Sequence, residues 1–203
     1  MKNVLVINSS LNGADGKSHQ LTDKFVQQLQ QKKPIQLVQR DLSEDALPHL
    51  DGAEMQAWMT DAQQRTPEQK ELAQRSQQLI DELKQSDILV IGMPMYNFGV
   101  PSVFKAWIDR IARAGITFRY TEQGPQGLIE GKKVYVLAAR GGIYQGTERD
   151  TQTHYLKNVL AFLGMTEVEF VYAEGLAMGE ESAQKSFANA DEKIFELIEK
   201  HVA

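Results

Sequence analysis

Four consecutive residues near the middle of the chain carry side chains that suit a flat heteroaromatic ring. The segment from Met95 to Phe98 supplies a thioether, two aromatic rings and one amide. Groups of these kinds stack on a ring or bind its polar edge. Aromatic residues that follow a strand also close a protein core, so this segment alone leaves both interpretations open.

A second group of polar residues lies near the N-terminus. Ser10, Gly16, Lys17 and Ser18 offer hydroxyls and backbone donors where we expect a helix to begin, an arrangement that suits a phosphate. Ser18 is predicted to be the N-cap of that helix, and a serine in this place often does no more than cap. A third candidate is the pair Gly141 and Gly142, which lets the backbone approach a ligand closely but is also typical of a left-handed turn.

The spacing of apolar residues predicts the strands and helices that must position these groups. Residues 88–91 are all apolar, as in a strand covered on both faces, and Pro94 cannot continue a central ladder. Four more strands are predicted at residues 4–8, 35–38, 134–139 and 168–172. Helices are predicted over about residues 18–33, 67–83, 101–114, 155–163 and 182–200. A short extended segment is expected at 118–121, and the irregular stretch 41–66 is long enough to suggest a functional or interface role.

This alternation predicts an α/β fold, a flavodoxin-like three-layer sandwich whose five parallel strands have the order 2-1-3-4-5. We expect a single domain over residues 1–203. Right-handed crossovers place the ends of strands one, three and four side by side, so the three polar loops should converge. Together they suit flavin mononucleotide (FMN), with its phosphate at the first loop, its ring at the second and the ring's carbonyl edge at the third. A dinucleotide fold is less consistent, because the first strand leads into no Gly-x-Gly-x-x-Gly.

Composition excludes several other classes of function. The chain has no cysteine, which rules out disulfides, a thiolate nucleophile and cysteine-ligated metal, and its four histidines show no metal-ligand spacing. A net charge of -5 argues against nucleic acid as a partner. No apolar run approaches the roughly 20 residues of a membrane span. Because the first residues run directly into a strand, we expect no signal peptide and a cytoplasmic location.

Several longer segments allow a comparison with a known family. They are Ser9-Ser10, Pro94-Met95-Tyr96-Asn97-Phe98, Ala112-Arg113-Ala114-Gly115, Thr117-Phe118-Arg119-Tyr120-Thr121-Glu122, Arg140-Gly141-Gly142, Phe162-Leu163-Gly164 and Ala173-Glu174-Gly175. On these segments, which extend over nearly the whole chain, the sequence resembles the FMN-dependent azoreductases of the flavodoxin-like superfamily, also described as NADH:quinone oxidoreductases.

The resemblance implies a set of site residues. Those implied to bind FMN are Ser10, Gly16, Lys17, Ser18, Met95, Tyr96, Asn97, Phe98, Ala139, Arg140, Gly141 and Gly142. Position 139 often carries a hydroxyl in such proteins, and the loop 11–17 also differs in detail. The resemblance also implies a homodimer whose substrate pocket is completed by Phe118, Tyr120 and Phe162. It does not indicate which subunit supplies them. No side chain is predicted to be catalytic and no metal is expected, because flavin N5 carries the chemistry.

The implied activity is the transfer of two electrons from NADH or NADPH to quinones and aromatic azo compounds by ping-pong exchange. One alternative is an electron carrier of the flavodoxin type, which binds the same cofactor without turning over a substrate. Another is a flavin-free regulatory module of the same fold. The modest charge and the long stretch 41–66, which offers a pocket wall, favour the enzyme.

Overall fold

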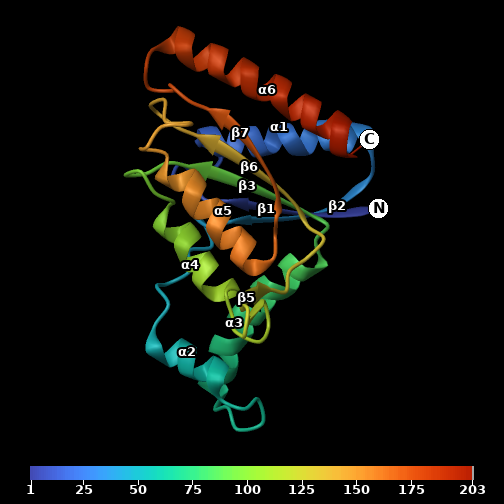
Figure 1. Ribbon diagram of the computed structural model, residues 1–203, viewed down its shortest axis with the longest axis vertical. Coiled ribbons are helices and arrows are strands. Elements are labelled where there is room, and N and C mark those ends of the chain that lie inside the picture. The colour runs from blue at the N-terminus through green and yellow to red at the C-terminus, as the bar shows by residue number, and fades with distance from the viewer. Residues whose placement is uncertain (203) are drawn as a thin grey trace.

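A central parallel sheet organises the computed structural model, which describes residues 1–202 (Figure 1). Its strands have the order β2-β1-β3-β6-β7, which confirms the predicted order of the five sheet strands. Their bounds are β1 Lys2–Asn8, β2 Ile35–Asp41, β3 Ile88–Pro94, β6 Lys133–Ala139 and β7 Glu167–Ala173. Strand β3 lies in the middle and all seven of its residues are buried, as its unbroken apolar run predicts.

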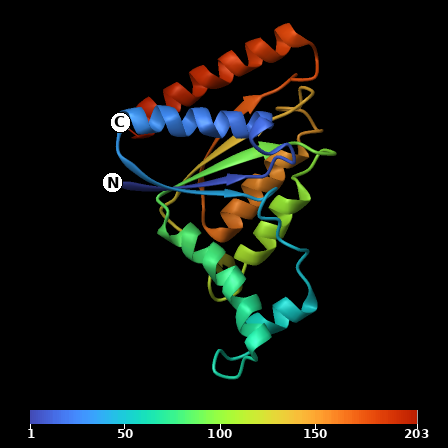
Figure 2. The ribbon, with the colours of Figure 1, turned by 180° about the vertical axis from the view of Figure 1, so that it is seen from behind.

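Helices cover both faces of this sheet, and each face has its own hydrophobic core. The helices α1 (Lys17–Lys32) and α6 (Glu180–Val202) pack on one face (Figure 2). The helices α3 (Pro67–Gln85), α4 (Ser102–Ile111) and α5 (Thr151–Leu163) pack on the other. Neighbouring residues of one strand belong to different cores: Val90 faces α1, whereas Ile91 faces α3 and α4. This three-layer arrangement confirms the predicted fold class.

The start of α1 differs from the prediction that Ser18 caps it. The helix begins at Lys17, and Gly16 is its N-cap, after a short 3-10 helix, η1 (Gly13–Asp15). A Cβ on Gly16 would lie 2.1 Å from Ser10 Oγ, so the chain can pass this point only as glycine. This close approach moves the cap two residues toward the N-terminus and places Ser18 in the first helical turn.

The stretch 41–66 contains a helix that its irregular pattern did not predict. This helix, α2 (Gly52–Met59), begins after Asp51, whose carboxylate accepts a hydrogen bond from Glu54 N at 2.8 Å. It packs beside α3 at the end of the molecule farthest from α6 (Figure 1). At the start of α3, Thr66 and Gln69 form a capping box in which each bonds to the other.

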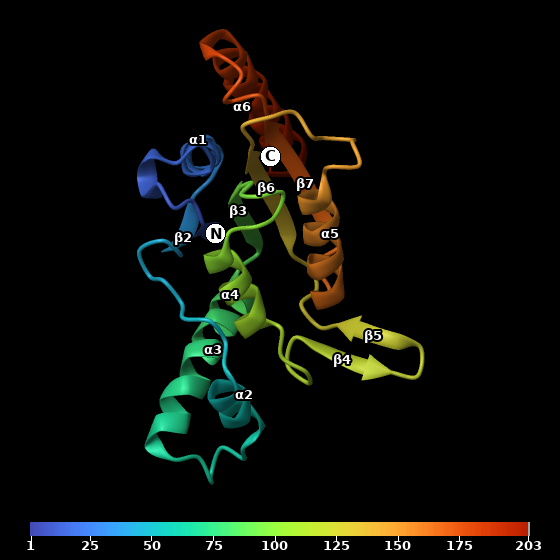
Figure 3. The same ribbon diagram turned by 90° about the vertical axis from the view of Figure 1, so that its left-hand side faces the viewer.

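A hairpin outside the main sheet accounts for the short extended segment. Strand β4 (Phe118–Thr121) pairs with β5 (Gly124–Gly127) in antiparallel orientation. Figure 3 shows this hairpin beside the C-terminal end of α5. Because α5 runs back across the sheet and Leu163 O accepts a hydrogen bond from Ile129 N just before β6, the hairpin lies near the amino ends of the strands. Among the described residues, no helix is both long and apolar enough to cross a membrane.

Candidate functional site

The loops after β1, β3 and β6 meet at the carboxyl edge of the sheet, as predicted. They enclose a cleft of about 220 Å³ to which the segment after β7 also contributes, through Leu176 and Ala177. Residues predicted to bind the cofactor line it from all three loops: Ser10, Lys17, Ser18, Met95, Tyr96, Ala139, Arg140 and Gly141. Leu176 and Ala177 have ordinary apolar side chains, so no sequence pattern indicated their place in the cleft.

The loop after β1 presents hydrogen-bond donors without acceptors. The first backbone hydrogen bond of α1 joins Gln20 N to Gly16 O. The backbone amides in the first turn of α1 therefore donate to no carbonyl of the helix. Ser18 Oγ is buried and has no hydrogen-bond partner among the described residues. A buried hydroxyl beside free amides at a helix N-terminus fits an anion such as a phosphate. Lys17 is exposed and its ammonium lies 5.6 Å from the centroid of the Phe187 ring, so its side chain reaches toward α6.

The loop after β3 makes a turn whose backbone is strained. Asn97 and Phe98 have positive φ angles of 50° and 63°, a conformation that asparagine tolerates and phenylalanine rarely adopts. Two bonds between Tyr96 and Gly99 close the turn, with N–O distances of 3.2 and 2.9 Å. Strain of this kind is concentrated at functional sites. The sequence showed the residue types but not this conformation, for which asparagine was the only available sign.

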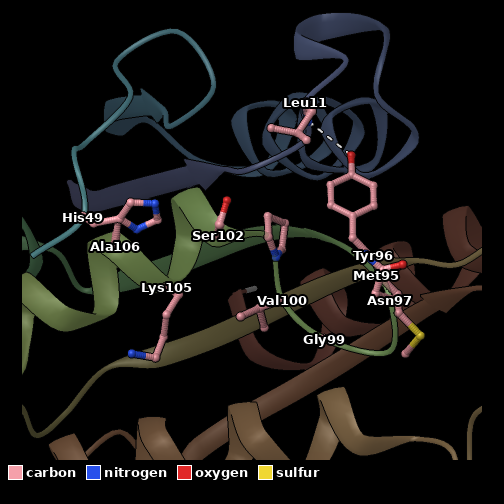
Figure 4. A pocket seen from close by; sticks show the side chains of 11 residues that line it. Leu11, His49, Met95, Tyr96, Asn97, Gly99, Val100, Ser102, Lys105 and Ala106 are labelled. Carbon is pink, nitrogen blue, oxygen red and sulfur yellow. Dashed lines mark hydrogen bonds between the residues drawn. The ribbon is translucent and has the colours of Figure 1, made fainter.

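Tyr96 joins the first two loops. Its hydroxyl accepts a hydrogen bond from Leu11 N at 3.2 Å, the dashed line in Figure 4. On one side of Tyr96 lies the cleft between the strand ends. On the other lies a larger cleft of about 840 Å³, whose walls include His49, Val100 and Lys105. Asn97 lines this second cleft, while Phe98 is half exposed and meets the Tyr144 ring edge-on at 5.6 Å.

His49 and Lys105 were not predicted to belong to any site. Figure 4 shows both side chains at the larger cleft, His49 from the irregular stretch before α2 and Lys105 from α4. An isolated histidine and a lysine on the polar side of a helix give no sequence signal of their own. Because the larger cleft shares Met95 and Tyr96 with the cleft between the strand ends, the two form adjoining parts of one region.

The diglycine after β6 has its carbonyls occupied and its amides free. The carbonyls of Gly141 and Gly142 accept hydrogen bonds from Ala177 N and Gly175 N at 3.0 and 2.9 Å. Within residues 1–202, neither glycine amide donates to a protein acceptor. The loop is therefore held through its oxygens and keeps two donors for a ligand. Ala139 is nearly buried just before it and offers no hydroxyl.

Arg140 also lines the cleft, but its guanidinium is engaged inside the protein. It donates to Asp150 Oδ1 at 2.8 Å, to Glu174 Oε1 at 3.0 Å and to Thr153 Oγ1 at 2.9 Å. Burial opposes ionisation of Asp150, yet the hydrogen bonds from Arg140 and Thr153 outweigh it and hold the pKa of Asp150 below its ordinary value. These contacts fasten the diglycine loop, whereas Arg140 Nε is buried and has no hydrogen-bond partner among the described residues.

The three aromatic residues predicted for the substrate pocket lie together, but away from the cleft of their own chain. The ring centroids of Phe118 and Phe162 are 4.4 Å apart, and those of Phe118 and Tyr120 are 5.7 Å apart. They gather at the hairpin near the amino ends of the strands, and Tyr120 is 74% exposed. The structure therefore brings these residues to one another and not to Met95 or Gly141.

Comparison with known proteins identifies the family. The model of the family described as having a flavodoxin-like fold matches residues 2–198. The FMN-dependent NADH:quinone oxidoreductase of Pseudoalteromonas atlantica is 55% identical over 198 residues, which are 98% of each chain. This chain belongs to that family. A second member, from Alteromonas mediterranea, is 53% identical over 97% of this chain and 98% of its own.

Solved structures agree with this assignment. An FMN-dependent NADH-azoreductase from Bacillus anthracis, in complex with FMN, has a TM-score of 0.86 at 27% identity, covering 97% of this chain and 99% of its own. Another azoreductase from Bacillus anthracis has a TM-score of 0.89 at 26% identity, covering 98% of this chain and 100% of its own. The comparisons confirm the predicted resemblance. They also confirm the prediction of an FMN-dependent oxidoreductase over the alternatives of an electron carrier and a flavin-free module.

Proposed function

We propose that this chain binds FMN in the cleft between the ends of β1, β3 and β6 and transfers two electrons from NADH to quinones and aromatic azo compounds. One observation carries the proposal for the site: unpaired donors stand at both ends of the cleft, with Met95 and Tyr96 between them. The printed functions of the relatives, NADH:quinone oxidoreductase and NADH-azoreductase, support the donor and both classes of acceptor.

The phosphate of FMN would lie at the first turn of α1. The free amides of that turn, the buried hydroxyl of Ser18 and the hydroxyl of Ser10 supply donors around one position. Gly16 allows Ser10 to come this close, because any side chain there would overlap its Oγ. Lys17 contributes through its backbone amide, since its ammonium is near Phe187.

The isoalloxazine ring would lie against Met95 and Tyr96, with its carbonyl edge at Gly141 and Gly142. When bound, FMN supplies the redox chemistry, because its ring exchanges two electrons with each substrate in turn. The two free amides stabilise negative charge at that edge without any reorganisation, since their carbonyls are already fixed. Asn97, which lines the adjoining larger cleft, would orient the ring's polar edge through its amide. No side chain serves as a general acid or base.

The acceptor pocket is completed by a second copy of the chain. Phe118, Tyr120 and Phe162 are too far along the molecule to reach the cleft of their own chain, yet Tyr120 is largely exposed and available to a partner. A homodimer that places this cluster over the partner's ring would give flat aromatic acceptors an apolar slot. The single FMN-binding domain and the cytoplasmic location stay predictions beside this proposal.

Steady-state turnover tests the proposed function. Purified protein loaded with FMN is assayed with NADH and with NADPH, against a quinone and an azo dye, at several concentrations of each. We expect parallel double-reciprocal lines, because each substrate reacts with a different form of the enzyme. Intersecting lines would contradict ping-pong exchange, and a colourless protein that cannot be reconstituted with FMN would contradict the site itself.

A further inference from the structure

The first turn of α5 is bonded to the strained loop after β3. Gln152 is 1% exposed, and its Nε2 donates to Pro94 O and to Gly99 O, both at 2.9 Å. The hydroxyl of Thr151 donates to Phe98 O. Two adjacent side chains, more than fifty residues away in the sequence, thus hold the carbonyl at the end of β3 and two carbonyls of the turn that follows.

These bonds hold the backbone where it is least favourable. Asn97 and Phe98 have positive φ, and such residues persist only when their surroundings over-determine the conformation. Among the residues that the structure describes, the turn's own hydrogen bonds are the two between Tyr96 and Gly99. Gln152 bridges the carbonyls before and after the strained pair, so it fixes the distance between the two ends of the turn.

The same helical turn also holds the diglycine loop. Asp150 accepts from Arg140, and its carboxylate caps α5 by accepting from Thr153 N at 3.1 Å. Arg140 in turn binds Glu174, whose carboxylate accepts from the amides of Tyr144 and Gln145. The residues from Asp150 to Thr153 are therefore bonded to both loops that face the proposed ring.

We propose that Gln152 is a positioning residue, which through the first turn of α5 sets the Met95–Phe98 segment relative to Gly141 and Gly142. This inference rests on the proposed function, because it assigns the two loops to one flavin ring. Gln152 lines neither of the two clefts beside Tyr96, so it acts through the carbonyls that it binds. A displaced turn moves the ring away from the glycine amides. This weakens binding of the negatively charged reduced ring more than binding of the oxidised ring.

The main test removes the side-chain amide of Gln152, which donates both hydrogen bonds, and keeps a side chain of similar size. Apoprotein carrying Gln152→Met is titrated with FMN, and the midpoint potential of the reconstituted protein is measured. We expect about tenfold weaker binding of oxidised FMN, as for the loss of one or two buried hydrogen bonds. We expect the affinity for reduced FMN to fall by a further factor of about ten. This difference lowers the midpoint potential by about 30 mV. Gln31→Met, at an exposed position on α1, serves as the matched control and should change neither value.

A second pair of variants covers the case in which Gln152→Met does not fold. Thr151 is exposed, so Thr151→Val removes its hydroxyl without opening the core, whereas Thr151→Ser keeps the donor. We expect about threefold weaker FMN binding and a lower potential for valine, and rescue of both by serine. Unaltered affinity and potential in Gln152→Met, or equal values for valine and serine, would overturn the inference. If unaltered apoprotein fails to bind FMN, the proposed function is wrong and the inference falls with it.

Discussion

Arg110 and Arg140 are both fully buried and both bind carboxylates, but they hold different regions of the molecule. Arg110 pairs with Glu54 at 2.6 and 2.9 Å and fastens α2 to α4, away from the carboxyl edge of the sheet. Arg140 pairs with Asp150 and Glu174 and fastens the diglycine loop at that edge. Similar chemistry therefore stabilises a peripheral helix in one case and shapes the proposed cofactor site in the other.

The surroundings of the two guanidiniums explain the difference. Arg110 also donates to the carbonyls of Pro48 and Ala106, so its contacts lie within α4 and the segment that leads to α2. The partners of Arg140 come from α5 and from the end of β7, and they in turn bind loop amides. A buried ion pair costs desolvation wherever it lies, so its function depends on which backbone segments it connects.

The largest expected effect comes from Arg140→Met. Removing the guanidinium leaves two carboxylates without their partner in a buried place, so the free energy of unfolding should fall by about 4 kcal/mol. FMN affinity should fall as well, by more than tenfold, because the diglycine loop loses its anchor. Urea denaturation and FMN titration measure the two effects, with Arg149→Met, exposed in the same loop, as control. A stability loss with unchanged affinity would make the two arginines equivalent and contradict the comparison.

Glu54→Gln tests the other side of the comparison. It keeps the shape of the side chain but leaves Arg110 without a buried counter-charge, so unfolding should become easier by about 3 kcal/mol. Because α2 does not contact the cleft between the strand ends, the FMN dissociation constant should stay within about twofold of its original value. The control is Glu130→Gln at an exposed position. A tenfold change in FMN affinity would show that α2 does act on the site.

Substitutions at Asn97 test which group binds the ring of FMN, and their expected effect on affinity and stability is smaller. Asn97→Ala removes the amide, so FMN binding should weaken by about tenfold, as for the loss of one hydrogen bond to the ring. It also places alanine at positive φ, which should lower the free energy of unfolding by about 1 kcal/mol. Asn97→Gly removes the same amide but suits the backbone conformation. If glycine restores the original affinity, the backbone rather than the side chain binds the ring. If both variants weaken binding equally, the amide itself does so.

The smallest expected effect is on acid stability. The pKa of Asp150 is lower in the folded protein than its ordinary value of 3.8, so its ion pair stabilises the fold above that value. This stability is lost as pH falls through the folded pKa. The difference in unfolding free energy between the unaltered protein and Asp150→Asn should be constant from about pH 5 to 7 and shrink below about pH 4. A difference that grows in acid would contradict this assignment of the carboxylate.

Local sequence signals predicted much of the architecture. Apolar runs and helical spacing located the five sheet strands within a few residues, because burial on one or two faces leaves a pattern in neighbouring positions. The capping box at Thr66 is local in the same sense, since its partners are three residues apart. The short helix α2 was not, because what holds it is Arg110, 56 residues beyond Glu54.

The sequence by itself determined the alternation of strands and helices, the three loops that carry the site and the family to which the chain belongs. These properties follow from residue types at short spacing. Only the tertiary structure decided that Arg140 turns inward, that Asn97 and Phe98 adopt positive φ, and that the aromatic cluster of the hairpin lies away from its own cleft. Each depends on contacts such as that between Gln152 and Pro94, 58 residues apart, and no local pattern encodes contacts of that kind.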